Sequence, residues 1–264
     1  MKNSTITATS NHAQNKGRWA SAALWTGAWV LAFFAVGEPL LLPSPWAVGI
    51  SLAKLIFTLE FWTVTAGSLL RILAGFLLGL AAGAVLAAIA SAHPAIKSVI
   101  GLPMNIIKAT PVASFVILAL LFIKGRGFSM FIAFLMVLPL SWSNILEGLG
   151  NTDSELLEMA RVYRFTRRDV MRYIYVPSIF PYLISAARVG MGFAWKAGIA
   201  GEVIAIPAGT IGTQLYNAKV HLDTADLFAW TVVIILLSLV LERATMSMLE
   251  LLTPARRVKG GRKL

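Results

Sequence analysis

The chain has 264 residues, of which 58% are hydrophobic and 13% charged, and its mean hydropathy is +0.76. Soluble domains carry about a quarter charged residues, so this composition excludes a soluble protein. The length permits about six membrane-spanning helices, because one span takes about 20 apolar residues. The formal net charge of +11 does not by itself indicate nucleic-acid binding, since the positions of cations matter more than their sum in a membrane protein.

The first 18 residues are polar and are expected to form a disordered cytoplasmic tail. A transmembrane domain is predicted over 19–249, and a basic cytoplasmic tail over 250–264. We expect an all-α, polytopic fold, with spans near 19–37, 65–90, 100–123, 128–149, 179–204 and 227–249. The first apolar run has full span length, which favours an uncleaved helix over a secretory signal.

Residues 38–62 connect the first two predicted spans. They contain several prolines and then a mildly amphipathic stretch, which suits a segment lying at the membrane interface. Trp46 and Trp62 fit an aromatic belt at that depth.

The distribution of Lys and Arg predicts the orientation. With the N-terminus in the cytoplasm, fourteen of these cations lie in cytoplasmic segments and four lie in outer loops, namely Lys54, Lys124, Arg126 and Lys219. Cytoplasmic segments of membrane proteins are enriched in Lys and Arg, so both termini are expected in the cytoplasm. The basic C-terminal tail is then expected to lie beside anionic lipid.

In the second predicted span, Gly75, Gly79 and Gly83 are four residues apart and share one helical face. Small residues at this spacing allow two helices to approach closely. The pattern favours packing within the chain over a contact between two subunits. It predicts a helix bundle and indicates nothing about a cargo.

The segment 150–178 is polar and lies between two spans on the predicted cytoplasmic side. Thr152 and Glu155 form a capping-box pattern, and Asp153 adds a negative charge near a helix N-terminus. A helix is therefore expected from about Asp153 to Arg164.

This expected helix carries a small apolar stripe at three- and four-residue spacing, formed by Leu156, Met159, Ala160 and Tyr163. A second helical stretch, TRRDVMRYIYV, follows before Pro177 and Pro181. Two short helices with an apolar stripe and many cations fit a docking element for a partner protein. On pattern alone they fit a positively charged membrane anchor equally well.

The spacing of this segment resembles the signature of binding-protein-dependent ABC importer permeases. That signature is Glu-Ala-Ala, three residues, Gly, nine residues, Ile, any residue and Leu-Pro. The corresponding residues here are Glu158, Met159, Ala160, Arg164, Ile174, Tyr175, Val176 and Pro177. Glu, Ala, Ile and Pro match, Val replaces Leu, and Met159 and Arg164 depart from the pattern.

Three further segments resemble the nitrate, sulfonate and taurine branch of these permeases. They are SLLRILAGFLLGLAAG, KATPVASFVILALLFIKGRG and ARVGMGFAWKAGIAGEVIA, and the similarity runs from about Phe61 to Leu251. A glycine at the position of Arg164 would allow positive φ in a tight turn. Arginine there implies a turn of ordinary φ, a strained turn, or a longer helix that offers a cation to the partner.

The resemblance implies a type I ABC importer permease in a bacterial cell membrane. It implies two permease subunits, as a homodimer or a pair of unlike chains with the homodimer favoured, a cytoplasmic ABC ATPase dimer and an extracytoplasmic substrate-binding protein. The chain has no G-x-x-x-x-G-K-[ST] phosphate loop. ATP and Mg are therefore expected on the partner ATPase, with no cofactor, metal or catalytic activity in this chain. The residues expected to couple it to the ATPase are Glu155, Glu158, Met159, Ala160, Tyr163, Arg164, Ile174 and Pro177.

Ionisable groups within spans are costly and often functional, which makes Lys108, Lys196 and Glu202 candidates for the translocation pathway. Lys196 could meet a small anionic cargo such as a sulfonate, taurine or nitrate. The alternative is an internal Lys196–Glu202 pair, or contact of Lys196 with backbone carbonyls. Residues 201–220 contain Gly and Pro and are typical of an outer re-entrant or gating segment.

Other functions are less well supported. The same machinery could import a vitamin precursor or another organic nutrient. A self-sufficient secondary transporter would usually carry coupling carboxylates in its spans, where Glu202 stands nearly alone. A membrane enzyme is unsupported, because the three histidines have no metal-ligand spacing and the chain has no G-x-S-x-G turn. Nucleic acid is not an expected partner, since the cations lie where topology places them.

Overall fold

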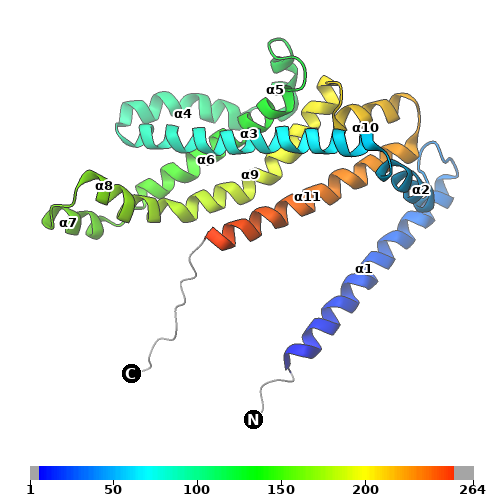
Figure 1. The fold of residues 1–264 in the computed structure, drawn as a ribbon, viewed down its shortest axis with the longest axis horizontal. Coiled ribbons are helices and arrows are strands. Elements are labelled where there is room, and N and C mark those ends of the chain that lie inside the picture. The colour runs from blue at the N-terminus through cyan, green and yellow to red at the C-terminus, as the bar shows by residue number, and fades with distance from the viewer. Residues whose placement is uncertain (1–5, 253–264) are drawn as a thin grey trace. The chain divides into compact units, whose positions relative to one another are not determined.

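The computed structural model describes residues 6–252, and its regular elements in that range are all helices (Figure 1). They are α1 (Ile6–Val36), α2 (Pro45–Ile56), α3 (Leu59–Ser91), α4 (Pro94–Ala109), α5 (Val112–Leu120), α6 (Phe128–Gly150), α7 (Ser154–Val162), α8 (Arg167–Val170), the π-helical turn η1 (Met171–Tyr175), α9 (Val176–Ala205), α10 (Ile211–Val220) and α11 (Thr224–Leu252). The predicted all-α class is confirmed.

Two compact units divide the chain. Unit 1 comprises Met1–Trp62 and Gln214–Val233, and unit 2 comprises Thr63–Thr213 and Ile234–Leu264. The candidate site residues all fall in unit 2.

Unit 2 is built on a close approach of α3 to α6. A Cβ atom added at Gly75 would lie 2.1 Å from the carbonyl oxygen of Met130, and one added at Gly83 would lie 2.7 Å from that of Leu138. Gly79, between them, meets α6 in the same way. No side chain fits at such distances, so these glycines allow the two backbones to touch. The prediction that this stripe serves packing within the chain is confirmed.

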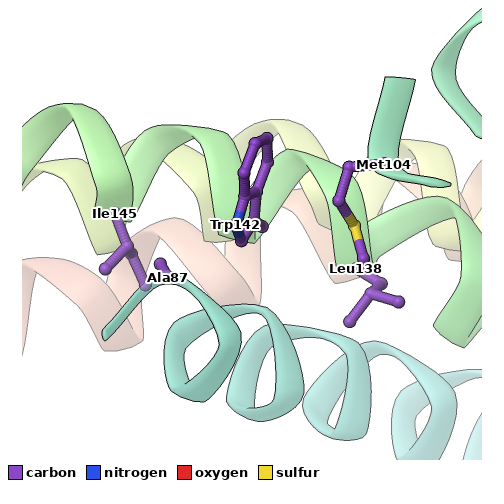
Figure 2. Close-up of a cluster of buried hydrophobic side chains, with 5 residues drawn as sticks. All are labelled: Ala87, Met104, Leu138, Trp142 and Ile145. Atoms are coloured by element: carbon purple, nitrogen blue, oxygen red, sulfur yellow. The ribbon is translucent and has the colours of Figure 1, made fainter. Parts of the chain in front are cut away.

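A hydrophobic cluster lies where α3, α4 and α6 meet (Figure 2). It consists of Ala87 from α3, Met104 from α4, and Leu138, Trp142 and Ile145 from α6. The α6 members follow the four- and three-residue spacing of one helical face. In lipid, where the hydrophobic effect between helices is absent, such tight packing is what associates them.

α9 is held along its length by its neighbours in unit 2. It packs extensively on α6. Tyr182 of α9 accepts a hydrogen bond from the Asn151 side-chain amide at 2.9 Å, and Trp195 donates to the carbonyl of Ile234 in α11 at 3.1 Å. These contacts anchor α9 at two points along its length, and both ends of the helix lead into candidate site residues.

Four described helical stretches are long and apolar enough to cross a membrane: Leu59–Ser91, Phe128–Gly150, Arg167–Ala205 and Thr224–Leu249. They correspond to the second, fourth, fifth and sixth predicted spans. The predicted boundaries differ from the observed helices mainly because each helix extends beyond its apolar stretch.

The third predicted span is not one straight helix, so that prediction is corrected. α4 and α5 pass the length and composition test only together, and they are bent by 105° at Thr110 and Pro111. Thr110 has φ −84° and ψ 130°, an extended conformation. A residue before proline is pushed out of the α region, and proline offers no N–H to continue the helix, so this dipeptide accounts for the break.

The first predicted span also differs from expectation. α1 begins at Ile6, so the expected disorder of residues 6–18 is wrong. Once a helix is nucleated, adding each further residue gains one hydrogen bond, which allows a polar extension. The apolar part found in α1, Ala23–Val36, is shorter than a normal span.

Unit 1 contains the predicted interface segment as helix α2. Ser44 caps it by accepting the N–H of Ala47 at 3.2 Å, and Pro45 occupies the first turn, where its missing N–H costs nothing. The hydroxyl of Ser51 donates to the carboxylate of Asp226 in α11. This bond ties α2 to the start of α11 within the unit.

Candidate coupling helix and buried Glu202 network

The helix predicted at the start of the polar loop is α7 (Ser154–Val162). Its N-cap is Asp153, whose carboxylate accepts the backbone N–H of Glu155 at 2.9 Å. The predicted Thr152 capping box is wrong, because the Thr152 hydroxyl donates to the carbonyl of Gly148 at 3.3 Å. Asp153 satisfies one of the N–H groups that the first turn leaves unpaired, and its charge suits the positive end of the helix dipole.

α7 ends in a Schellman motif at Arg164, which has a φ of +53°. The N–H of Phe165 bonds to the carbonyl of Ala160 at 2.9 Å, and the N–H of Arg164 bonds to that of Arg161 at 3.1 Å. This pairing usually places glycine at the left-handed position. Of the alternatives for Arg164, the strained turn is the one observed, since left-handed backbone is costly for a residue with a Cβ.

The outward face of α7 mixes acidic and apolar side chains. Six of its exposed residues fall within about 160° of the helix surface, at about 100° per residue. They are Glu155, Leu156, Glu158, Met159, Val162 and Tyr163. Ser154 and Arg161 are exposed too, and they widen the exposed arc to about 220°. Val162 is 77% and Tyr163 71% exposed. Exposed apolar side chains that gather on one face mark an interaction surface more than scattered ones do.

Two residues of the signature face the interior. Ala160 and Ile174 are each 3% exposed. The predicted apolar stripe is therefore corrected at Ala160, which points away from the outward face. Glu158, Arg164 and Pro177 are exposed.

The second helical stretch of the loop is not separate from the next span. α8 (Arg167–Val170) begins at a capping box and continues through the π-helical turn Met171–Tyr175 into α9. A proline ring clashes with the carbonyl four residues before it. The π turn directly before Pro177 widens the helix there, as the N–H of Val176 bonds five residues back. α7 and α8 lie together at the end of the α6–α9 pair that is remote from α5 (Figure 1).

Glu202 is fully buried near the C-terminal end of α9. Its Oε2 accepts hydrogen bonds from the hydroxyl of Ser68 at 2.9 Å and from the backbone N–H of Gly212 at 3.2 Å. Its Oε1 lies 3.9 Å from Nη2 of Arg71 and has no hydrogen-bond partner in the described chain. A buried carboxylate needs an ion pair and hydrogen bonds, and here α3 and α10 supply the ion pair and the hydrogen bonds to Oε2.

Lys196 does not pair with Glu202. Lys196 is exposed, whereas Glu202 is buried and pairs with Arg71 within the described range 6–252. Six residues separate the two side chains by about 60° around a helix and about 9 Å along it, which explains why they diverge. The alternative of an internal Lys196–Glu202 pair is wrong.

Lys108 lies at the C-terminal end of α4, next to the break before α5. Its ammonium group donates to the hydroxyl of Ser143 and lies 6.0 Å from the ring centroid of Trp142. No carboxylate of the described chain forms an ion pair with it. A cavity of about 270 Å³ adjoins Lys108, and Phe193 of α9 also lines it. Lys196 is three residues beyond Phe193, on the same side of α9.

The sequence reasoning missed Ser68 and gave Arg71 no role. The available signal was a lone cation well inside an apolar helix, with a hydroxyl three residues earlier on the same face. Nothing in the sequence indicated that their partner would be Glu202, which lies 134 residues after Ser68.

Residues 75–258 match the family described as binding-protein-dependent transport system inner membrane component. The chain is 26% identical over 224 residues to a probable ABC transporter permease protein of Brucella melitensis, covering 84% of this chain and 90% of that protein. It is 22% identical to the taurine transport system permease protein of Escherichia coli, covering 88% of this chain and 86% of that one. It is 24% identical to a putative aliphatic sulfonates transport permease protein of Bacillus subtilis, covering 80% and 75%.

The fold is also similar to a solved structure, that of an amino acid ABC transporter with histidines. The TM-score is 0.61 at 18% sequence identity, covering 76% of this chain and 96% of that chain. The likeness concerns the fold alone. Together with the family match over well over half of the chain, it supports a multi-pass inner membrane protein. The chain belongs to the binding-protein-dependent transport family and is an ABC importer permease subunit.

Proposed function

We propose that α7 is the element through which a cytoplasmic ABC ATPase dimer drives this permease. The observation that carries the proposal is a short helix capped at both ends, with apolar and acidic side chains exposed on one face. A cap at each end supports a helix that is too short to be stable by propensity alone. ATP and Mg are bound by the ATPase, and this chain supplies the surface that moves.

The signature residues divide into two groups. Glu155, Glu158, Met159 and Tyr163 lie on the outward face, where the ATPase would touch them. Ala160 and Ile174 are buried and support the helix from behind, Arg164 forms the turn, and Pro177 lies at the π turn that leads into α9. Movement imposed on α7 then passes into the continuous helix Arg167–Ala205, as expected for elements that move as rigid bodies.

The coupling role is tested with Glu158→Lys in the permease purified with its ATPase. We expect loss of the stable complex and of stimulated ATP hydrolysis, because the change reverses a charge on the outward face. Glu147→Lys is the matched control, since Glu147 is exposed but lies on α6. Normal binding and stimulation in Glu158→Lys would show that the segment is a charged anchor. Uptake by this chain without ATP or ATPase would instead indicate a secondary transporter.

A second copy of the chain is proposed as the partner in the membrane. α9 is buried along one side, and its exposed residues Arg188, Val189, Phe193 and Lys196 lie within about 140° of one another on the other side. A strip with two cations is unsuited to lipid, so it suits a water-filled pathway between two subunits. The proposed orientation places both termini in the cytoplasm and α10 at the side where a substrate-binding protein delivers cargo.

The proposed cargo is a small anion such as a sulfonate, taurine or nitrate. Two relatives are named for taurine and for aliphatic sulfonates. Lys108 has no carboxylate partner in the described chain and adjoins a cavity. Lys196 is exposed on the side of α9 that carries Phe193, a residue lining the same cavity. Cations without a fixed counter-ion at membrane depth can attract an anion as it passes.

The cargo proposal is tested by taurine uptake into proteoliposomes that contain the permease, its ATPase and its binding protein. Lys196→Met and Lys108→Met are each expected to lower uptake about tenfold, while Lys97→Met, a change outside the strip, has little effect. ATP hydrolysis in detergent serves as the control for assembly. Uptake of a neutral organic nutrient that is insensitive to both changes would support the vitamin-type alternative.

A further inference from the structure

The segment between α9 and α10, residues 206–210, is an ordered turn. Ile206 and Gly209 have φ values of +49° and +71°, so the chain leaves the helix abruptly. The hydroxyls of Thr210 and Thr213 both donate to the carbonyl of Pro207, at 3.0 and 2.7 Å. Thr210 is fully buried. Irregular backbone at membrane depth is tolerated where its polar groups are satisfied, and the carbonyls of residues 207–209 each accept a hydrogen bond here.

Side chains from other elements hold this turn. The hydroxyl of Ser68 accepts the backbone N–H of Ile211 at 3.0 Å. Arg71 Nη2 donates to the carbonyl of Gly209 at 3.3 Å. Arg126, in the connection between α5 and α6, donates through Nε to the carbonyl of Ala208 at 3.2 Å.

Glu202 links these contacts to α9. Its carboxylate binds Gly212 on the far side of the turn as well as Ser68 and Arg71 on α3. A Cβ atom at Gly212 would lie 2.4 Å from Cβ of Glu202, so only glycine permits this approach. Glu202 and Gly212 are ten residues apart and move with α9 and α10, whereas Ser68 and Arg71 belong to α3.

The contacts of Arg71 are the weakest in the cluster. Its guanidinium lies 3.3 to 3.9 Å from its partners, against 2.9 to 3.2 Å for the bonds of Ser68 and Glu202 to their nearest partners. Its Nε is buried and has no hydrogen-bond partner in the described chain. If Arg71 moved away from the turn, the contacts between α9 and α10 would remain intact.

We propose that Arg71 and Glu202 form a lock that holds residues 206–212 closed, and that this turn is a gate at the outer end of the pathway. The proposal rests on the proposed function for the orientation and for the existence of a transport cycle. Opening separates Arg71 from the carbonyl of Gly209 and from Glu202 and also breaks the bonds of Ser68 to Glu202 and Ile211, while Glu202 stays bonded to Gly212. Arg71 and Glu202 are positioning residues, which act on cargo only through the turn.

The chain contains no cysteine, so Ala208→Cys introduces a single thiol on the exposed part of the turn. The labelling rate of this thiol by a polar maleimide is measured in the full chain in membranes. Adding Arg71→Met is expected to raise the rate about tenfold, because the turn opens locally more often. Arg71→Lys should restore part of the protection, since it keeps the charge. Arg243→Met, which removes an exposed arginine of α11, should leave the rate unchanged.

If Arg71→Met does not fold, Arg126→Gln provides the second test, because Arg126 is exposed and donates a hydrogen bond to the carbonyl of Ala208 in the turn. It should raise labelling by a smaller factor. An unchanged rate in both folded variants would overturn the lock.

The gate is tested in the complete complex with its ATPase. Arg71→Met is expected to raise ATP hydrolysis several-fold in the absence of binding protein. Faster labelling with wild-type hydrolysis and uptake would overturn the gate. Thiol labelling is measured without cargo or ATPase, so its outcome is independent of the coupling role of α7.

Discussion

The two ends of α9 are organised in opposite ways. Before it, α7 is fixed by a cap at each end and directs most of its side chains outward. After it, the turn at residues 206–210 is irregular, and inward-pointing side chains hold its backbone. Side chains on a surface that binds a partner stay available for that partner, whereas side chains around a segment that must stay closed form hydrogen bonds to its backbone. One long helix connects the two.

The interior that supports both ends should tolerate truncation far less than the surface of α7. Trp142→Ala removes the largest member of the cluster between α3, α4 and α6, and it should lower the free energy of unfolding by about 3–5 kcal/mol. Tyr163→Ala, on the 71% exposed side chain, should change it by no more than about 0.5 kcal/mol. Thermal unfolding in detergent compares them, and equal losses would mean that α7 packs against its own chain.

The close approach of α3 to α6 offers the next test. Gly75→Ala places a methyl group 2.1 Å from a backbone oxygen and should cost about 1–3 kcal/mol of unfolding free energy or prevent folding. Gly27→Ala is the matched control, because nothing lies within 4 Å of a Cβ atom added at that position in α1. This change should be neutral or slightly stabilising. Chemical denaturation of the purified variants gives both values. Equal stability would place the glycine stripe away from α6.

The N-cap of α7 is tested by Asp153→Ala. Loss of the bond to the Glu155 N–H should destabilise the helix by about 0.5–2 kcal/mol. Hydrogen exchange of the first-turn amides should speed up, while exchange in α9 stays slow. Ser154→Ala is the control, since Ser154 follows the cap. Unchanged exchange in Asp153→Ala would show that the helix does not depend on this cap.

The smallest expected effect concerns the turn after α7. Arg164→Gly relieves a left-handed arginine and should raise stability by up to about 1 kcal/mol. Arg164→Ala keeps the strain and should bring no gain. If the turn rather than the charge matters, Arg164→Gly also retains ATPase binding. Loss of binding in both variants would instead assign Arg164 a direct contact.

Much of the fold could be predicted from the sequence because the length of an apolar segment directly reflects the thickness of the bilayer. The glycine stripe of α3 likewise reported a close helix contact, and the structure supplied its partner, α6. The break at Thr110 and Pro111 was also readable in principle, since a residue before proline avoids the helical region. A single span was predicted instead, because the apolar run continues through the break.

Helix α7 was predicted more accurately than the buried network. Caps and helix spacing are local, so α7 was found within about two residues, an ordinary boundary error. Its cap still shifted from Thr152 to Asp153, because Thr152 found a partner in α6. Glu202 was identified, but its partners Ser68, Arg71 and Gly212 come from elements distant in sequence. Only tertiary packing brings them together.

The central claim is that the outward face of α7 contacts the ATPase, and site-specific photocrosslinking tests it most directly. A photoreactive residue at Met159 is compared with one at His93, which is exposed in the connection between α3 and α4 on the same expected side of the membrane. We predict that the ATPase crosslinks to position 159 and not to position 93. An assembled complex with no crosslink at 159, or with equal crosslinks at both, would contradict the account.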